Sequence, residues 1–175
     1  FVEKNPETAR AFMRALQRMT DGEAGIRRAA MGELMTIDDT QGAPYIAKKM
    51  VDQDPLIRME AVGLLARYQA KGYNSEIATL MTDPEGRVRS AAGSALKDAG
   101  DPGIIYSLGS ALASSDLATV SNALSVWKTY ARKQPAASIG VITAALSAQD
   151  DAILQEAVAA IDASRDVPAG TPRGE

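Results

Sequence analysis

The stretch "TDPEGRVRSAAGSALKDAG", residues 82–100, carries the signals of one complete helix. An Asp-Pro pair stands near its start and a glycine closes it, which are common marks of helix beginnings and ends. Val88, Ala92 and Leu96 recur four residues apart, the spacing of one face of an α-helix. The question that decides the fold is whether this stretch occurs more than once.

The same pattern recurs along the whole chain. Its first positions, which we call anchors, are Ile26, Ile57, Val88, Val120 and Ile153. Successive anchors are separated by 31, 31, 32 and 33 residues, and a nearly fixed period of this length is the signature of stacked helical repeats. Apolar residues between the anchors predict a second helix in each unit, at about 43–51, 74–82, 102–113 and 135–147.

The sequence therefore predicts an all-α, right-handed α-solenoid (an α-α superhelix) of about five helix pairs. The predicted single domain covers residues 1–163, with a capping helix at 1–19 and repeats near 20–51, 52–82, 83–114, 115–148 and 149–163. Two prolines and two glycines in residues 164–175 predict an extended tail that docks on another subunit. In such stacks each unit contacts mainly its neighbours, so function is expected on the surfaces.

Helix boundaries are predicted from Asp, Pro and Gly. An Asp side chain accepts a hydrogen bond at the N-cap, Pro fits the first turn, and Gly ends a helix in the left-handed conformation. We expect N-caps at Asp54, Asp83, Asp116 and Asp150 and C-terminal stops at Gly72 and Gly100.

The pattern Asp-Pro-x-x-x-Val-Arg-x-x-Ala-x-x-x-Leu resembles short HEAT repeats, of the type also found in phycobilisome-lyase-like proteins. The resemblance covers roughly residues 20–163 and is most specific in the first three units. It implies a polar ladder between layers, made by the Asp at each helix start and an Arg about one turn later. The matching pairs are Asp54 with Arg58, Asp83 with Arg89, and Asp21 with Arg27.

The last two units depart from this pattern. Ser121 and Leu154 stand where the ladder arginine is expected, so the ladder should stop after the third layer. Leu154 then marks either a covered C-terminal end or a surface against another chain.

Composition excludes several kinds of chemistry. The chain contains no Cys and no His, which removes disulfides, thiolate and imidazole catalysis, Cys/His zinc sites and the Ser-His-Asp triad. We therefore expect no enzyme activity, no cofactor and no metal. A net charge of −3 counts against a nucleic-acid binder that relies on bulk positive charge.

Candidate binding residues fall into two groups. Arg10, Arg14 and Arg18 form a row on the first helix, which is either a basic edge for an acidic partner or phosphate, or a solvated face. Lys48, Lys49, Tyr106 and Ser110 lie on predicted second helices, the layer that lines the inner curve of HEAT-like solenoids. Together they predict a polar groove that binds protein.

The C-terminal part of the chain differs from the N-terminal part in rings and charge. Trp127 continues the apolar stripe of its helix and is predicted to be buried, whereas Tyr130 is predicted to be partly exposed. Residues 134–164 contain no Lys or Arg but several carboxylates. A basic end and an acidic end would orient a partner or promote head-to-tail contact.

The leading hypothesis is a non-enzymatic scaffold or adaptor, a subunit of a larger assembly that binds protein through the concave helix layer and the tail. Two alternatives stay open: attachment or detachment of bilins, which the resemblance implies, and nucleic-acid binding by a helical repeat. The start at Phe1 is compatible with trimming or with signal-peptide cleavage. The protein is expected to be soluble, without a transmembrane segment, and cytoplasmic or, after cleavage, periplasmic.

Overall fold

The computed structural model describes residues 5–131, 133, 142–143 and 151–165, and these ranges contain helices and no strand. The all-α repeat fold predicted from the anchors is confirmed. The chain forms two compact units, residues 1–100 and 101–175, which we call unit 1 and unit 2.

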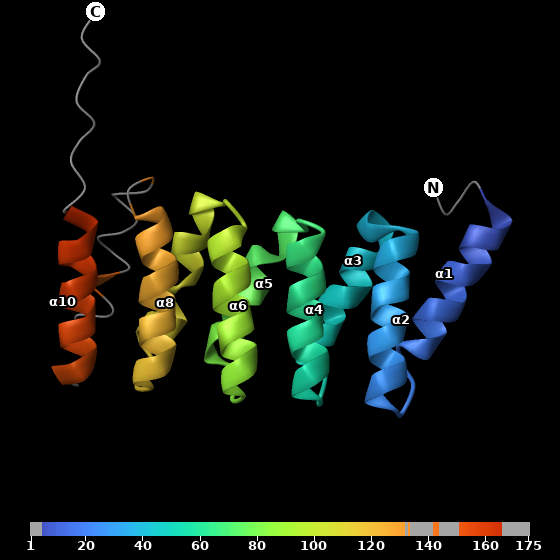
Figure 1. Cartoon of the computed structure of the whole chain (residues 1–175), viewed down its shortest axis with the longest axis horizontal. Coiled ribbons are helices and arrows are strands. Elements are labelled where there is room, and N and C mark those ends of the chain that lie inside the picture. Colours follow the sequence, from blue (N-terminus) through green and yellow to red (C-terminus); the bar gives the residue numbers. More distant parts are fainter. Residues whose placement is uncertain (1–4, 132, 134–141, 144–150, 166–175) are drawn as a thin grey trace, which may run out of the picture. The chain divides into compact units, whose positions relative to one another are not determined.

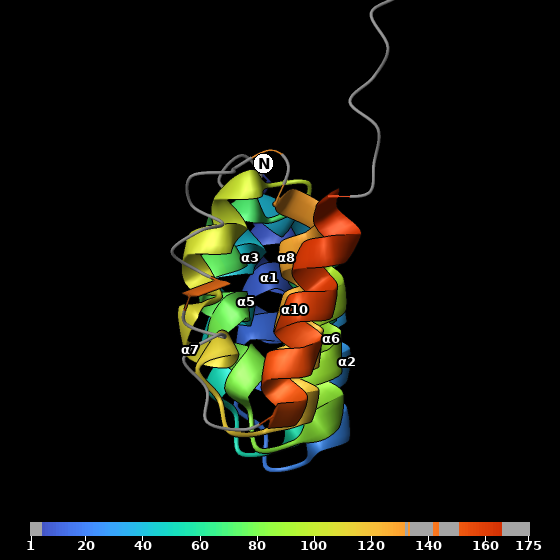
Figure 2. The same cartoon turned by 90° about the vertical axis from the view of Figure 1, so that its left-hand side faces the viewer.

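Unit 1 is built from two layers of helices. One layer holds the longer helices α2 (Ala24–Ile37), α4 (Pro55–Arg67) and α6 (Gly86–Asp98), with α1 (Pro6–Arg18) packed against α2 (Figure 1). The other layer holds short elements: α3 (Asp39–Ala47), the 3-10 turn η2 (Lys48–Val51), η3 (Lys71–Tyr73), α5 (Asn74–Thr79) and η4 (Leu80–Thr82) (Figure 2). The predicted second helices are therefore present, but each ends in a 3-10 turn.

The core of unit 1 follows the repeated pattern. The alanines four residues after the anchors, Ala30, Ala61 and Ala92, are fully buried, and so are the leucines that follow them. A methyl group at the centre of each helix lets neighbouring helices approach closely, while the larger residues on either side fill the remaining space. Packing of this kind makes the middle of each long helix intolerant of a polar side chain.

The helix ends agree only in part with the predicted signals. Asp54 caps α4 by accepting a hydrogen bond of 2.8 Å from the Leu56 amide. Asp83 does not cap α6, because the N-cap residue of that helix is Glu85, two residues after Asp83. Gly100 follows α6 with a φ of +67°, as expected of a stop. The residue with positive φ after α4 is Gln69, at 53°, and not Gly72, which lies in η3.

Unit 2 contains η5 (Pro102–Ser107), α7 (Gly109–Leu112), α8 (Leu117–Tyr130) and α10 (Asp151–Arg165). α8 packs against η5 and α7 and also against α10. The predicted helix 102–113 is split at Leu108 into a 3-10 turn and a short α-helix. Asp116 caps α8 as predicted, accepting from the Thr119 amide at 3.2 Å.

Trp127 and Tyr130 both belong to the core of unit 2. Trp127 is 3% exposed, as predicted, but Tyr130 is only 1% exposed, so its predicted partial exposure is wrong. Tyr130 lies one turn after Val126 and Trp127 and shares their buried face of α8, which outweighs the charged residues that flank it in sequence. Apart from residues 142–143, the predicted helix 135–147 lies outside the described residues, as do Asp150 and residues 166–175 of the predicted tail. α10 runs to Arg165, two residues into that tail.

Candidate functional site

The starts of the long helices in unit 1 carry a repeated arginine contact. Arg27, in the first turns of α2, donates from Nη1 to the carbonyl oxygens of Asp21 and Gly22, at 2.9 Å each. Its Nη2 donates to the Asp52 carboxylate at 3.0 Å, which reaches from one repeat to the next. One side chain therefore holds the loop before its own helix and the loop before the following helix.

Arg58 makes the same kind of contact one repeat later, also within unit 1. Its Nη1 donates to the carbonyl oxygens of Asp52 and Gln53, at 2.9 and 3.2 Å. Its Nε and Nη2 donate to the two carboxylate oxygens of Asp83, at 2.7 and 2.8 Å. A bidentate contact of this kind is stronger and more directional than a single ion pair.

Arg89 makes the intra-repeat part of the same contact, from Nη1 to the carbonyl oxygens of Asp83 and Pro84, at 2.8 and 3.1 Å. We call Arg27, Asp52, Arg58, Asp83 and Arg89 the Arg–Asp ladder. The side chains of its two inter-repeat ion pairs are between 4% and 12% exposed. Breaking such a buried pair leaves a charge without its partner.

Both ladder aspartates are held in the ionised form. Burial alone would raise the pKa of Asp52, but the Asp54 amide and the Arg27 guanidinium outweigh it, so the pKa lies below its usual value. The pKa of Asp83 is lowered in the same way, against the effect of burial, by Arg58 and by the Glu85 amide. The hydrogen bonds to Asp83 raise the pKa of Arg58.

The ladder differs from the prediction in how its members pair. The predicted pairs are Asp54 with Arg58 and Asp21 with Arg27, but Arg58 binds the Asp83 carboxylate and Arg27 binds that of Asp52. The carboxylate that joins the first two repeats is Asp52, whereas Asp54 caps α4. The other predicted members, Arg27, Arg58, Asp83 and Arg89, all take part, and Asp21 contributes its carbonyl oxygen. Met-x-Asp precedes the helix at Met19, Met50 and Met81, and alignment on these methionines would have identified Asp52.

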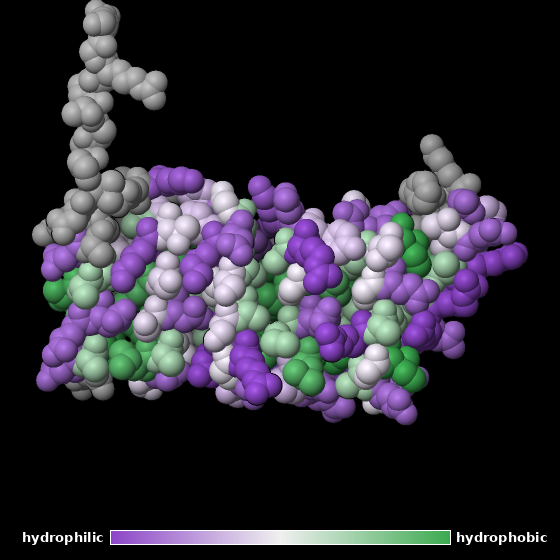
Figure 3. Space-filling view, in the orientation of Figure 1, coloured by the Kyte–Doolittle hydropathy of each residue, from purple (hydrophilic) through white to green (hydrophobic). Residues whose placement is uncertain are grey.

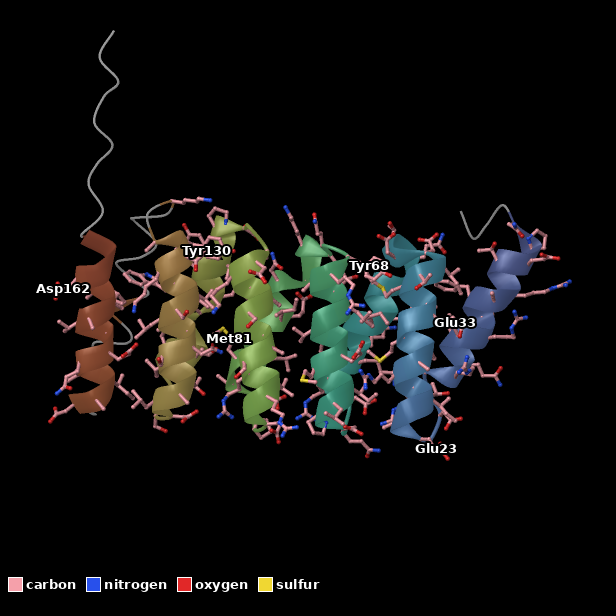
Figure 4. All side chains as sticks on the ribbon, viewed as in Figure 1. Glu23, Glu33, Tyr68, Met81, Tyr130 and Asp162 are labelled. Atoms are coloured by element: carbon pink, nitrogen blue, oxygen red, sulfur yellow. The ribbon has the colours of Figure 1, made fainter. Side chains whose placement is uncertain are left out.

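The three arginines of α1 do not behave alike. Arg10 and Arg14 are exposed, and no described carboxylate pairs with either. Arg18 donates to Glu33 of α2 at 2.8 Å and so helps to attach α1 to its neighbour; Glu33 is labelled in Figure 4. The part of the predicted basic edge that can meet a partner is therefore Arg10 and Arg14.

The predicted groove residues of unit 1 lie on the turn η2. The Nζ atom of Lys48 stands 5.5 Å from the centre of the Tyr45 ring, which itself packs edge-on against Phe12 at 6.0 Å. Lys49 is drawn instead to Asp52 of the ladder, at 3.4 Å. Val51, at the end of the same turn, is 85% exposed. We call Tyr45, Lys48 and Val51 the η2 surface.

The other predicted groove residues belong to unit 2. Tyr106, on η5, is 69% exposed, and Ser110, in the first turn of α7, is exposed as well. An exposed tyrosine can stack and donate a hydrogen bond, so Tyr106 is a second point at which a protein partner could bind. The predicted groove residues are thus divided between the two units.

A hollow that the sequence did not indicate lies within unit 1, where α4 and α6 end. It measures about 410 Å³ and is lined by apolar residues of the two helices, among them Leu65 and Ala95, together with Gln69, Lys71, Asn74 and Asp98. Tyr68, labelled in Figure 4, lines two shallower hollows on the α3 side of the same loop. No local sequence signal marks this region, because the residue that turns the chain out of α4 is Gln69, in a left-handed conformation that usually selects glycine.

Two structural features are absent from the described residues. They contain no cluster of three or more His, Cys, Asp or Glu that could hold a metal ion, and none of their helices has the length and apolar character needed to cross a bilayer. On the face of the long helices, polar and apolar residues are interspersed (Figure 3).

Comparison with known proteins agrees with the fold. No family model and no curated protein sequence matches the chain. Among solved structures, an engineered protein from the Northeast Structural Genomics Consortium is similar over 86% of this chain and 77% of its own, at 17% identity and a TM-score of 0.52. A designed armadillo repeat protein in complex with the peptide (KR)4 is similar over 93% and 85%, at 14% identity and a TM-score of 0.51. The chain therefore has a helical-repeat fold.

Proposed function

We propose that this chain is a non-enzymatic protein-binding scaffold of the HEAT-repeat type, a subunit of a larger assembly, and that a partner binds its η2 surface. The observation that carries the proposal is the exposure of Val51, at 85%, beside the half-exposed ring of Tyr45 and the ammonium group of Lys48. Tyrosine and apolar groups that lie together at a surface are typical of the centre of protein interfaces.

The charge of the η2 surface suggests what the partner carries. Lys48 has no described carboxylate within ion-pair distance, so its charge is available to a partner. The designed armadillo protein is in complex with a basic peptide. The η2 surface is itself basic, and we therefore expect a protein segment in which carboxylates alternate with apolar side chains.

Lys48 and Lys49 can be separated by their surroundings. Lys49 lies 3.4 Å from Asp52, within the ladder, so Lys49→Glu would place a carboxylate next to Asp52 and weaken the fold. Lys48 is exposed and lies over the Tyr45 ring, so Lys48→Glu should leave the fold intact. The single Lys48 variant therefore reports on binding alone.

The test begins with affinity capture from the native source and mass spectrometry of the proteins that co-purify. Binding of the captured partner to purified wild-type, Lys48→Glu and Lys128→Glu chains is then measured by calorimetry. Lys128 is an exposed lysine of α8 and serves as the matched control. We expect Lys48→Glu to weaken binding roughly tenfold or more and Lys128→Glu to have little effect. Equal binding by all three would remove the η2 surface as the site.

A further inference from the structure

Helix α10 presents to solvent a face that other long helices bury. In α2 and α4, the ladder arginine and the residue four positions later lie on one stripe, and the arginine shows that this stripe faces the next repeat. The second residues of these stripes, Met31 and Val62, are fully buried. The corresponding residues of α10 are Leu154 and Val158, and Val158 is 49% exposed. α10 therefore has the form of a helix that receives another helix.

The two apolar residues of this face are surrounded by polar and acidic groups. Leu154, Val158 and Asp162 line a shallow hollow of about 390 Å³, together with Gln155 and Ala159. Asp162 projects from α10 on the side away from α8 (Figure 4). Asp151 lies on the same stripe, one turn before Leu154. The segment from Asp151 to Asp162 contains no Lys or Arg. We call this stripe the α10 face.

The outer side of α1 has the complementary composition. Phe12, Ala15 and Met19 are buried on the side of α1 that packs on the rest of unit 1. Met13 is 64% exposed on the other side. Arg10, Arg14 and Gln17 surround Met13 at helical spacing, so an apolar residue is again ringed by polar groups, but here the charge is positive. We call Arg10, Met13, Arg14 and Gln17 the α1 face.

We infer that the α1 face of one molecule docks on the α10 face of a second copy of the same chain. Each face has an exposed apolar centre, and the surrounding charges are of opposite sign, so the contact would bury both apolar centres and bring arginines to aspartates. Two different faces are used, so the contact is heterologous and can extend into a chain of copies or close into a ring. It uses neither the η2 surface nor Lys48 and can be tested separately from partner binding.

The experiment is sedimentation velocity of the full chain over a wide range of protein concentration, at low and at high salt. We expect the wild type to associate as its concentration rises, and salt to weaken the association because the charges are exposed. Arg14→Asp and Asp162→Arg each oppose like charges across the contact and should weaken association roughly tenfold or more. Arg87→Asp, which replaces an exposed arginine of α6 outside both faces, is the matched control and should associate as the wild type does.

Mixing the two variants identifies the geometry. Arg14→Asp retains a normal α10 face, and Asp162→Arg retains a normal α1 face. An equimolar mixture should therefore associate more strongly than either variant alone, which a symmetric contact between two like faces cannot produce. Thermal unfolding of each variant checks that the fold is intact. A wild type that is monomeric throughout, or variants that associate as the wild type does, would overturn the inference.

Discussion

Unit 1 and unit 2 stack helices of the same pattern but join them differently. In unit 1, Arg27 and Arg58 each link two repeats through hydrogen bonds to backbone carbonyls and to a buried carboxylate. In unit 2, the position of the arginine is held by Ser121, which donates to Glu156 of α10 at 3.3 Å. The apolar core is common to both units, because Ala61 and Ala157 are both fully buried.

This difference separates the contacts that drive folding from the contacts that set how one repeat sits on the next. Burial of apolar side chains drives both units to form, and it needs only the right residue types at the right spacing. The ladder adds directional contacts that set how one repeat sits on the next. Unit 2 shows that the stack forms without them.

The largest effect is expected where the two units are alike. Ala61→Asp in unit 1 and Ala157→Asp in unit 2 each place a carboxylate in a fully buried site, and each should cost about 4 kcal/mol or more of unfolding free energy. Circular dichroism during thermal unfolding measures both. Ala29→Asp, at an exposed position of α2, is the control and should unfold almost as the wild type does. Normal melting of either core variant would show that its helix is placed wrongly.

A smaller effect is expected from acid, through the two ladder aspartates of unit 1. The pKa values of Asp52 and Asp83 are lowered on folding, so their contribution is complete above the unfolded value of about 4 and is lost as the pH falls through the folded value. Asp83→Asn should therefore be less stable than the wild type at neutral pH, by about 3 kcal/mol. The gap should shrink in acid. Urea titrations over a pH series measure it, and a gap that is independent of pH would contradict the ladder's charge.

The turns that follow α4 and α6 should differ by about 1 kcal/mol in opposite directions. Gln69 and Gly100 hold corresponding positions and both have positive φ, which costs a residue with a side chain about 1 kcal/mol. Gly100→Ala should therefore destabilise the chain and Gln69→Gly should stabilise it. Chemical denaturation of the two variants against wild type provides the comparison, and equal signs would mean that one of the turns is wrongly described.

The smallest effect is expected at the contact that replaces the ladder. Ser121→Ala removes one hydrogen bond of 3.3 Å to a half-buried carboxylate and should cost less than about 1 kcal/mol. The same denaturation assay measures it. A loss as large as that of Asp83→Asn would mean that unit 2 depends on its polar contact as much as unit 1 does.

The repeat can be predicted from the sequence because the anchors from Ile57 onward are buried and evenly spaced, and burial limits which residues can occupy them. Ala61 and Ala92, which lie four residues after Ile57 and Val88, are buried for the same reason. The predicted ladder is displaced by two residues at Asp54 because two Asp-Pro pairs look alike in sequence. Asp54-Pro55 begins a helix, whereas Asp83-Pro84 precedes the cap residue Glu85.

Other features depend on contacts that no local pattern reveals. Charged neighbours suggest an exposed Tyr130, but its burial is decided by the face of α8 on which it lies. Gln69 occupies a conformation that usually selects glycine, so composition points to Gly72 instead. The separate roles of Lys48 and Lys49 follow from which side chain each of them reaches, a ring or a carboxylate, and adjacent positions in a sequence cannot distinguish them.

The most direct measurement is a double-mutant cycle on the ladder. The unfolding free energies of the wild type, Arg58→Ala, Asp83→Ala and the double variant give the coupling between the two side chains, and Ser121→Ala with Glu156→Ala gives the matched value for unit 2. We expect a coupling of about 1–3 kcal/mol for the buried bidentate pair and about 0.5 kcal/mol or less for the serine contact. A coupling near zero between Arg58 and Asp83, or equal values in the two units, would contradict an Arg–Asp ladder that joins the repeats of unit 1.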